Sequence, residues 1–268
     1  MATINRGLKM IYQLIVSTMN QQDDSLIERM NISSDAIIIN QSNKFSYHET
    51  IVEQSTVKWY EFNERGIGLS RNSGLMRATA DIIQFADDDM QFTDTYQDDV
   101  ISEYEAHPEA DVILFSNRCL NKDRMPYQVD SFGRVGRIEG VNFGGARITA
   151  RREKLLYNNI TFSLLFGGGA KYGAGEDVTF VQDCIKAGLK VYKSPVIVST
   201  MEQNSSTWFK GFDEKYYRDK GALLAANFPF LSNVGIYIQA FKKRGGNHSF
   251  TELVRFYRDG AKEFKDKK

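Results

Sequence analysis

Acidic side chains gather at two points of the chain, and the first point is the stretch Asp87, Asp88 and Asp89, directly after the apolar run IIQFA. Three adjacent carboxylates repel one another, and a divalent cation between them and a phosphate removes that cost. Mg²⁺ and Mn²⁺ prefer oxygen ligands and often use one or two carboxylates plus substrate phosphates. In an extended segment alternate side chains point the same way, so Asp87 and Asp89 are expected to face one ligand and Asp88 another direction. The alternative is a solvated acidic turn.

The second acidic point is Glu176-Asp177, within the sequence GAGEDVTF. Glycines precede the pair, and an amphipathic pattern follows it, which indicates the first turn of a helix. A carboxylate is the kind of group that removes a proton from a hydroxyl during group transfer. The alternative is structural, because acidic residues in a helix's first turn gain about 0.3–1 kcal/mol from the helix dipole.

The segments that must position these acids alternate between strand-like and helix-like patterns. Strands are predicted at 10–17, 36–40, 57–63, 82–86 and 111–117, and helices at 67–80 and 98–106. Such alternation is typical of βαβ units and a mostly parallel sheet, in which ligands bind at the carboxyl ends of the strands. Polar residues 17–20, 40–41 and 87–89 follow three of these strands, so we expect them to share one edge.

The second half of the chain is less regular. Residues 130–175 are rich in glycine, and this irregular stretch predicts functional loops or disordered segments. Within them, Asn142–Thr149 would either let the backbone approach a sugar or only turn the chain. A helix is predicted at 176–187, short strands at 191–192 and 196–200, and helical structure from 208 to 268. The whole is interpreted as one domain with a helical tail.

Composition limits the classes of function. Lys+Arg and Asp+Glu both number 34, so no overall positive charge favours a nucleic acid partner. Two cysteines and three scattered histidines show no metal-ligand spacing. No apolar run approaches the roughly 20 residues of a membrane span, and Met1–Lys9 lacks a signal-peptide core, which predicts a cytoplasmic protein.

Basic residues cluster near the end of the chain, at Lys242–Arg244 and Lys262–Lys268. A solvated surface is the simplest interpretation. The functional alternative is attraction to anionic lipids, worth roughly 1 kcal/mol for each basic residue near the surface. That attraction would place the protein peripherally at the inner face of a membrane.

Several spaced motifs together resemble glycosyltransferase family 2. Asn63–Asp89 resembles the family's glycine-containing loop, its Arg-Asn-x-Gly helix and the strand that ends in Asp-x-Asp. Ile15–Asn20 and Ile37–Ser42 resemble its first two strands, although Ser17 stands where proline is common and Asn40-Gln41 where an acid is frequent. Gly175–Pro195 resembles the Glu-Asp helix and the following strand.

The resemblance implies a GT-A fold, an α/β domain with a Rossmann-like, mostly parallel sheet flanked by helices. The expected domain covers residues 1–230, with a nucleotide-binding half at about 1–118, an acceptor-binding half at about 119–230 and a helical extension at 231–268.

The resemblance also implies residue roles. Thr18, Asn20 and Gln41 would lie near the nucleoside, Asp88 would contribute to the nucleotide-sugar site, and Arg71 would reach the diphosphate unless it is merely a solvated helix arginine. Asp87 and Asp89 would hold Mn²⁺ or Mg²⁺, with Asp89 the more direct ligand. Asp177 would be the general base and Glu176 would bind the acceptor.

One region departs from the family pattern. Relatives often supply a further metal ligand, commonly histidine, after the Glu-Asp helix and its strand, whereas residues 198–208 contain none. Glu202, Gln203, Asn204 or water would substitute. Trp208 and Phe209 would either line a sugar site or belong to the core.

The expected function is inverting, metal-assisted transfer of a sugar from a UDP-linked donor to a hydroxyl of a glycan or lipid-linked glycan. A nucleotidyltransferase is the first alternative, but residues 18–25 contain neither glycine nor lysine for a phosphate loop. A two-metal phosphodiesterase and a non-catalytic nucleotide-sugar-binding module are the others. A dehydrogenase is disfavoured, because no GxGxxG motif follows the first strand.

Overall fold

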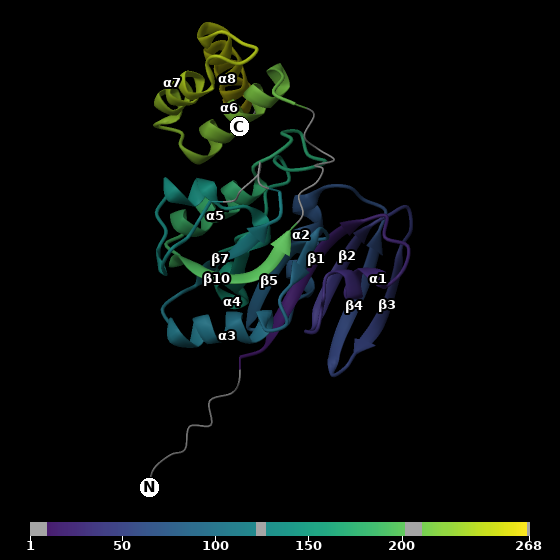
Figure 1. Ribbon diagram of the computed structural model, residues 1–268. Helices are drawn as coiled ribbons and strands as arrows, with labels where there is room; N and C mark the ends of the chain where they lie inside the picture. The colour runs from purple at the N-terminus through teal and green to yellow at the C-terminus, as the bar shows by residue number, and fades with distance from the viewer. Residues whose placement is uncertain (1–9, 122–126, 202–210, 267–268) are drawn as a thin grey trace.

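A computed structural model describes residues 10–121, 127–201 and 211–266 (Figure 1). The described residues form one ten-stranded sheet with the order β3-β4-β2-β1-β5-β9-β7-β10-β6, and β8 pairs with β10. The strands are β1 (Tyr12–Met19), β2 (Ala36–Gln41), β3 (Ser46–Val52), β4 (Ser55–Phe62), β5 (Ile82–Asp87), β6 (Met90–Phe92), β7 (Val112–Cys119), β8 (Gly133–Arg134), β9 (Ile148–Arg151) and β10 (Val191–Met201).

Helices cover both faces of this sheet. They are α1 (Ser25–Arg29), α2 (Ile67–Arg77), α3 (Tyr96–Ala106), α4 (Arg152–Tyr157) and α5 (Glu176–Lys186). Leu14 and Val16 of β1 pack in the core cluster that contains α1 and α3, whereas Ile15 packs in the cluster that contains α2 and α5. Because both faces are buried, the central strands are continuous apolar runs rather than alternating ones. The fold is therefore a mixed α/β sandwich, as the sequence predicts.

Parallel pairing brings three polar clusters to one edge of the sheet. β1 pairs in parallel with both β2 and β5, so that Ser17 lies opposite Asp87 and Met19 lies opposite Gln41. The strand ends predicted to share an edge do share it. Thr18 and Met19 lie inside β1 rather than after it, because backbone pairing with β2 continues beyond the last aliphatic residue.

Several elements differ from the sequence prediction. The stretch expected to be irregular contains β9 and α4, and β9 runs antiparallel between β5 and β7. β3, also unpredicted, is an antiparallel edge strand paired only with β4 within the described residues. The two short strands expected around Pro195 are one strand, β10, whose register with β7 shifts between Lys193 and Ile197 and so accommodates the proline.

Three further helices lie together beyond the carboxyl edge of the sheet (Figure 1). They are α6 (Glu214–Asn227), α7 (Ser232–Lys243) and α8 (Phe250–Lys265), which begins with a capping box between Ser249 and Glu252. They share a separate apolar core that also takes in Phe166 and Tyr172. The boundary at residue 230 stays a prediction, and α6, which precedes it, packs against α8.

A helix that spans a bilayer needs roughly 20 mostly apolar residues. No helix within the described residues is both long and apolar enough to span a membrane.

Candidate active site

A cavity of about 800 Å³ opens at the carboxyl edge of the sheet, and both acidic clusters line it. Its walls come from the ends of β1, β2 and β5, the start of α2, the start of α5 with the loop before it, and the loop before β9. The lining residues are Ser17, Thr18, Met19, Gln41, Ile67, Arg71, Asp87, Asp88, Asp89, Val141, Asn142, Phe143, Gly144, Gly168, Gly173, Ala174, Gly175, Glu176, Asp177, Val178 and Lys220.

The first acidic cluster is held from two sides. The Thr18 hydroxyl donates a hydrogen bond to Asp88 Oδ2 at 2.6 Å, and Arg71 Nη2 donates to Asp87 Oδ1 at 2.6 Å. All three aspartates line the cavity, although alternate directions were expected for Asp88. The reason is that β5 ends at Asp87 and a turn follows it, so the alternation of an extended strand does not continue.

Arg71 connects the two acidic clusters. Its side chain is buried, with Nη1 donating to Glu176 Oε1 at 3.0 Å as well as Nη2 donating to Asp87, and its guanidinium lies 5.1 Å from the Phe162 ring centroid. Burial works to lower the pKa of Arg71, but Asp87, Glu176 and Asp177 raise it, so the guanidinium stays charged. Arg71 is therefore a buried, ion-paired arginine rather than a solvated one on a helix surface.

Two glycines leave room for this ion-paired group. A Cβ atom added to Gly145 would lie 2.5 Å from Arg71 Nη1. A Cβ atom added to Gly167 would lie 2.8 Å from Glu176 Oε2, and Gly167 also has a φ of +105°, which side chains disfavour. Glycine at these positions lets the backbone pass close to the guanidinium and to the carboxylate.

The second acidic cluster begins α5. Both residues are part-buried, and Glu176 Oε2 accepts a hydrogen bond from the Gly175 N–H at 3.2 Å. Burial and the neighbouring Asp177 raise the pKa of Glu176, whereas Arg71 opposes the rise. Asp177 is partly exposed in the cavity, and its Oδ1 accepts from the Val178 N–H at 2.7 Å. The two carboxylates thus differ in environment.

Most of the residues singled out in the sequence line the same cavity, and Asn20 is the exception. Its side chain is exposed, its φ is +56°, and its backbone N–H donates to the Gln41 carbonyl at 3.0 Å. Gln41 lines the cavity, and its Oε1 accepts from the Gly66 N–H at 2.6 Å, which fixes the loop before α2.

Other lining residues have weaker signals or none. The loop residues Asn142, Phe143 and Gly144 belong to the stretch in which a sugar contact was one of two interpretations. Lys220 of α6 has no sequence signal, because only the packing of the C-terminal helices brings it to the cavity. Glu202, Gln203 and Asn204, the suggested further metal ligands, and Trp208 and Phe209 lie outside the described residues.

The charge balance of the cavity suits a cation. Five carboxylates line it (Asp87, Asp88, Asp89, Glu176 and Asp177) against two cationic side chains (Arg71 and Lys220), an excess of three negative charges among the described residues. The described part of the chain contains no group of three or more His, Cys, Asp or Glu side chains placed to hold a metal. Mg²⁺ and Mn²⁺ commonly bind one or two carboxylates together with substrate phosphates, and this lining fits that mode rather than an all-protein site.

Family comparison agrees with this arrangement. The sequence pattern of the family described as Glycosyl transferase family 2 matches residues 1–166, which include both halves of the Arg71–Asp87 ion pair. The chain belongs to glycosyl transferase family 2. As a member, this glycosyltransferase carries the Asp-x-Asp strand end inside the matched region and the Glu-Asp pair after it. No curated protein matches it in sequence.

Solved structures share the fold of this glycosyltransferase. S. aureus TarS 1-349 in complex with UDP-GlcNAc has a TM-score of 0.60 and 14% identity, over 96% of this chain and 72% of that one. S. aureus TarS 1-349 without a named ligand has a TM-score of 0.61 and 12% identity, over 97% of this chain and 92% of that one. The mannosyltransferase PcManGT from Pyrobaculum calidifontis, in complex with GDP-Man and Mn²⁺, has a TM-score of 0.52 and 12% identity. The match covers 95% of this chain and 70% of that one. The fold is therefore GT-A, as predicted.

Proposed function

We propose that this glycosyltransferase moves a sugar, with inversion, from a nucleotide-diphosphate sugar to a hydroxyl of a glycan or lipid-linked glycan. The observation that carries the proposal is the single cavity lined by both Asp87-Asp88-Asp89 and Glu176-Asp177. A donor diphosphate at the first cluster and an acceptor hydroxyl at the second would meet inside it. Membership of the family supports the reaction class.

Asp177 is the proposed general base. Both residues line the cavity, but Glu176 is paired with Arg71 at 3.0 Å, whereas Asp177 Oδ1 accepts from the Val178 N–H of its own helix. In the proposed step the acceptor oxygen attacks the anomeric carbon, the Asp177 carboxylate takes the hydroxyl proton, and the bond from that carbon to the donor phosphate oxygen breaks. The nucleoside diphosphate leaves with the bonding electrons. Attack from the face opposite the leaving group inverts the configuration.

Glu176 and Arg71 have proposed roles that follow from their contacts. Arg71 lines the cavity while it pairs with Asp87 and Glu176, so its positive charge lies where a diphosphate would bind. We assign Arg71 to the diphosphate side and to the alignment of both clusters. Glu176 holds Arg71 in place and lies beside the acceptor side of the cavity.

Asp89 and Asp87 would hold Mn²⁺ or Mg²⁺, with Asp88 beside them in the donor site. A bound cation supplies charge stabilisation for the departing diphosphate. The excess of negative charge in the cavity supports this assignment. Without a cation, the negatively charged diphosphate of the donor would be repelled by these carboxylates.

The donor is proposed to carry uridine. Among the structural neighbours one is bound to UDP-GlcNAc and another to GDP-Man, so both nucleosides occur on this fold. Thr18 and Gln41 line the side of the cavity assigned to the nucleoside, and Asn20 follows β1 next to them.

The test is a panel of UDP-, GDP- and other nucleotide-linked sugars with the full chain, with and without Mn²⁺ or Mg²⁺. We expect one donor to raise the melting temperature in a metal-dependent way, because a ligand that binds only the folded state stabilises it. We also expect slow hydrolysis of that donor and transfer to a saccharide acceptor.

The matched variants are Asp89→Ala and Asp94→Ala, since Asp94 is exposed and not part of the cavity lining. Asp89→Ala should remove the metal-dependent stabilisation, and Asp94→Ala should leave it. The proposal fails if no nucleotide sugar stabilises the protein under any condition. Cleavage of simple phosphodiesters in its place would favour a phosphodiesterase.

A further inference from the structure

The helix α7 has apolar side chains on the side that faces away from the protein. Val234, Tyr237, Ile238 and Phe241 are each between 44% and 56% exposed, and they recur at helical spacing along one face. Phe230 and Leu231, just before α7, are also exposed, whereas Ile236 and Ala240 form the buried face. A surface helix normally turns polar residues outward, so this apolar stripe is unusual.

The neighbouring helix α8 has a stripe of the opposite kind. Arg255, Arg258, Lys262 and Lys265 are exposed at intervals of three and four residues and so occupy one face. Leu253, Phe256 and Tyr257 are buried on the other face. The outer side of α8 is therefore basic over most of its length.

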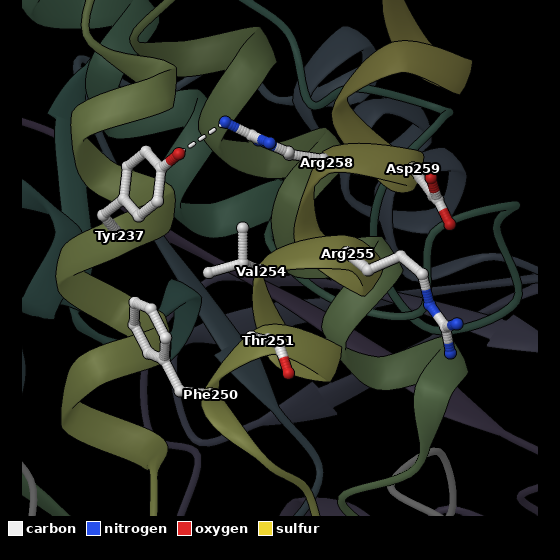
Figure 2. A pocket seen from close by; sticks show the side chains of 7 residues that line it. All are labelled: Tyr237, Phe250, Thr251, Val254, Arg255, Arg258 and Asp259. Carbon is white, nitrogen blue, oxygen red and sulfur yellow. Dashed lines mark hydrogen bonds between the residues drawn. The ribbon is translucent and has the colours of Figure 1, made fainter.

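The apolar and basic stripes adjoin one another. Arg258 Nη2 donates a hydrogen bond to the Tyr237 hydroxyl at 2.5 Å, which joins α8 to α7. Figure 2 shows this pair in a groove of about 390 Å³ that Phe250 and Val254 also line, while the Arg255 side chain extends to the other side of α8, where Asp259 also lies. The result is an apolar ridge with the Arg258 guanidinium at its border.

The charges beside the apolar ridge are mostly positive. The basic residues of this helix pair are Lys242, Lys243, Arg244, Arg255, Arg258, Lys262 and Lys265, and the acidic residues of the same segment are Glu252, Asp259, Glu263 and Asp266. Glu263 is paired with Arg218 and Lys171 of other segments, and Glu252 caps its own helix at Ser249. A partner must therefore offer an apolar layer next to negative charge.

We propose that the α7–α8 surface, defined as Val234, Tyr237, Ile238 and Phe241 with Arg255, Arg258, Lys262 and Lys265, binds the surface of an anionic lipid bilayer. Apolar side chains that enter the headgroup boundary, with basic residues that contact lipid phosphates, are the features of interfacial helices. The apolar stripe was not predicted from the sequence, in which membrane contact was assigned to the basic tail alone. The inference does not depend on the proposed function.

The test is flotation of the full chain with phosphatidylcholine vesicles that contain or lack phosphatidylglycerol, without donor or metal. We expect binding only to the anionic vesicles, and weaker binding as salt is added, because exposed charges are screened. A failure to bind anionic vesicles at low ionic strength would overturn the proposal.

Two double variants locate the binding surface. Ile238→Ser/Phe241→Ser should weaken vesicle binding at least about tenfold, since it removes the apolar ridge. Arg255→Gln/Arg258→Gln should weaken it by about fivefold for each basic residue lost near the surface. The controls are Tyr157→Ser, an exposed aromatic on another helix, and Lys44→Gln/Lys190→Gln, two exposed lysines of the sheet unit.

Thermal melts by circular dichroism verify that each variant is folded. If both α7–α8 variants bind vesicles like the unmodified chain, the proposal is wrong. The proposal is also wrong if the unmodified chain does not bind vesicles but forms dimers, and Ile238→Ser/Phe241→Ser dissociates those dimers. The surface would then be an interface with a second copy of the chain.

Discussion

The two acidic clusters lie in one cavity but are built in different ways. Asp87 and Asp88 extend from a strand end at the centre of the sheet, where parallel pairing with β1 fixes the backbone. Glu176 and Asp177 open a helix, and the Arg71 guanidinium connects Glu176 to Asp87. Strand pairing fixes the backbone of the first cluster, whereas the second lies in the first turn of a helix, where Glu176 pairs with the buried Arg71. The comparison indicates that substitutions will affect the two sides unequally.

The largest effect is expected from Asp177→Asn. Removal of the proposed general base should lower the rate of sugar transfer by roughly 10²–10⁴-fold and leave donor binding intact, because the first cluster is unchanged. Single-turnover transfer and donor-induced thermal shifts measure the two quantities. Asp183→Asn, on the outer side of the same helix, is the control. Normal transfer by Asp177→Asn would show that the base is another group.

Next in size is Arg71→Met, which removes the connection between the clusters. Loss of one partner of a buried ion pair leaves carboxylates unpaired, so we expect a loss of about 3 kcal/mol in the free energy of unfolding. Donor binding and transfer should fall together. Urea unfolding and thermal shift measure these effects, with Arg77→Met, on the exposed side of α2, as the control. A variant as stable as the unmodified chain would show that each cluster is positioned independently.

A smaller effect is expected from Gly145→Ala, which leaves every charge in place. The added methyl carbon would lie 2.5 Å from Arg71 Nη1, and the guanidinium cannot retreat without lengthening its ion pairs. Overpacking of this kind costs about 1–3 kcal/mol. Gly136→Ala is the matched control, because nothing lies within 4 Å of an added Cβ there. Equal unfolding midpoints for the two variants would contradict the close packing.

The smallest effect concerns pH and Glu176→Gln. Because burial raises the pKa of Glu176 in the folded state, this group stabilises the fold most below its unfolded pKa of about 4.5, and that contribution is lost as the pH rises through the folded value. Glu176→Gln should reduce this loss in the free energy of unfolding as the pH rises, because glutamine does not titrate. Unfolding free energies measured across the acidic to neutral range test it, and an unchanged pH profile would mean that Arg71 outweighs burial.

The sequence predicts the sheet centre well and the side-chain network less well. The run that begins at Ala36 is apolar because both faces of the strand are buried, and such a continuous apolar run can be recognised as a central strand from the sequence. The polar ends of those strands then locate the cavity. The burial of Arg71 could not be predicted, because its partners lie far along the chain and helix periodicity says nothing of them.

Three other features could not be predicted, each for its own physical reason. Lys220 reaches the cavity only through the packing of three helices, and β9 is too short to give a periodic pattern. The exposed side of α7 reads as an ordinary apolar helix face, since sequence alone does not tell which of two faces packs inward.

The position of β9 has a consequence for how the protein is synthesised. β5 and β7 do not pair with each other, and Ile148–Arg151 fills the place between them. A nascent chain that has emerged only as far as β7 would hold the partial sheet β3-β4-β2-β1-β5 with an open edge at β5, together with an unpaired β7, and such edges attract other strands. The seam closes once residue 151 has left the ribosome, so slow translation of residues 120–151 would prolong the period in which the unfinished enzyme is prone to aggregation.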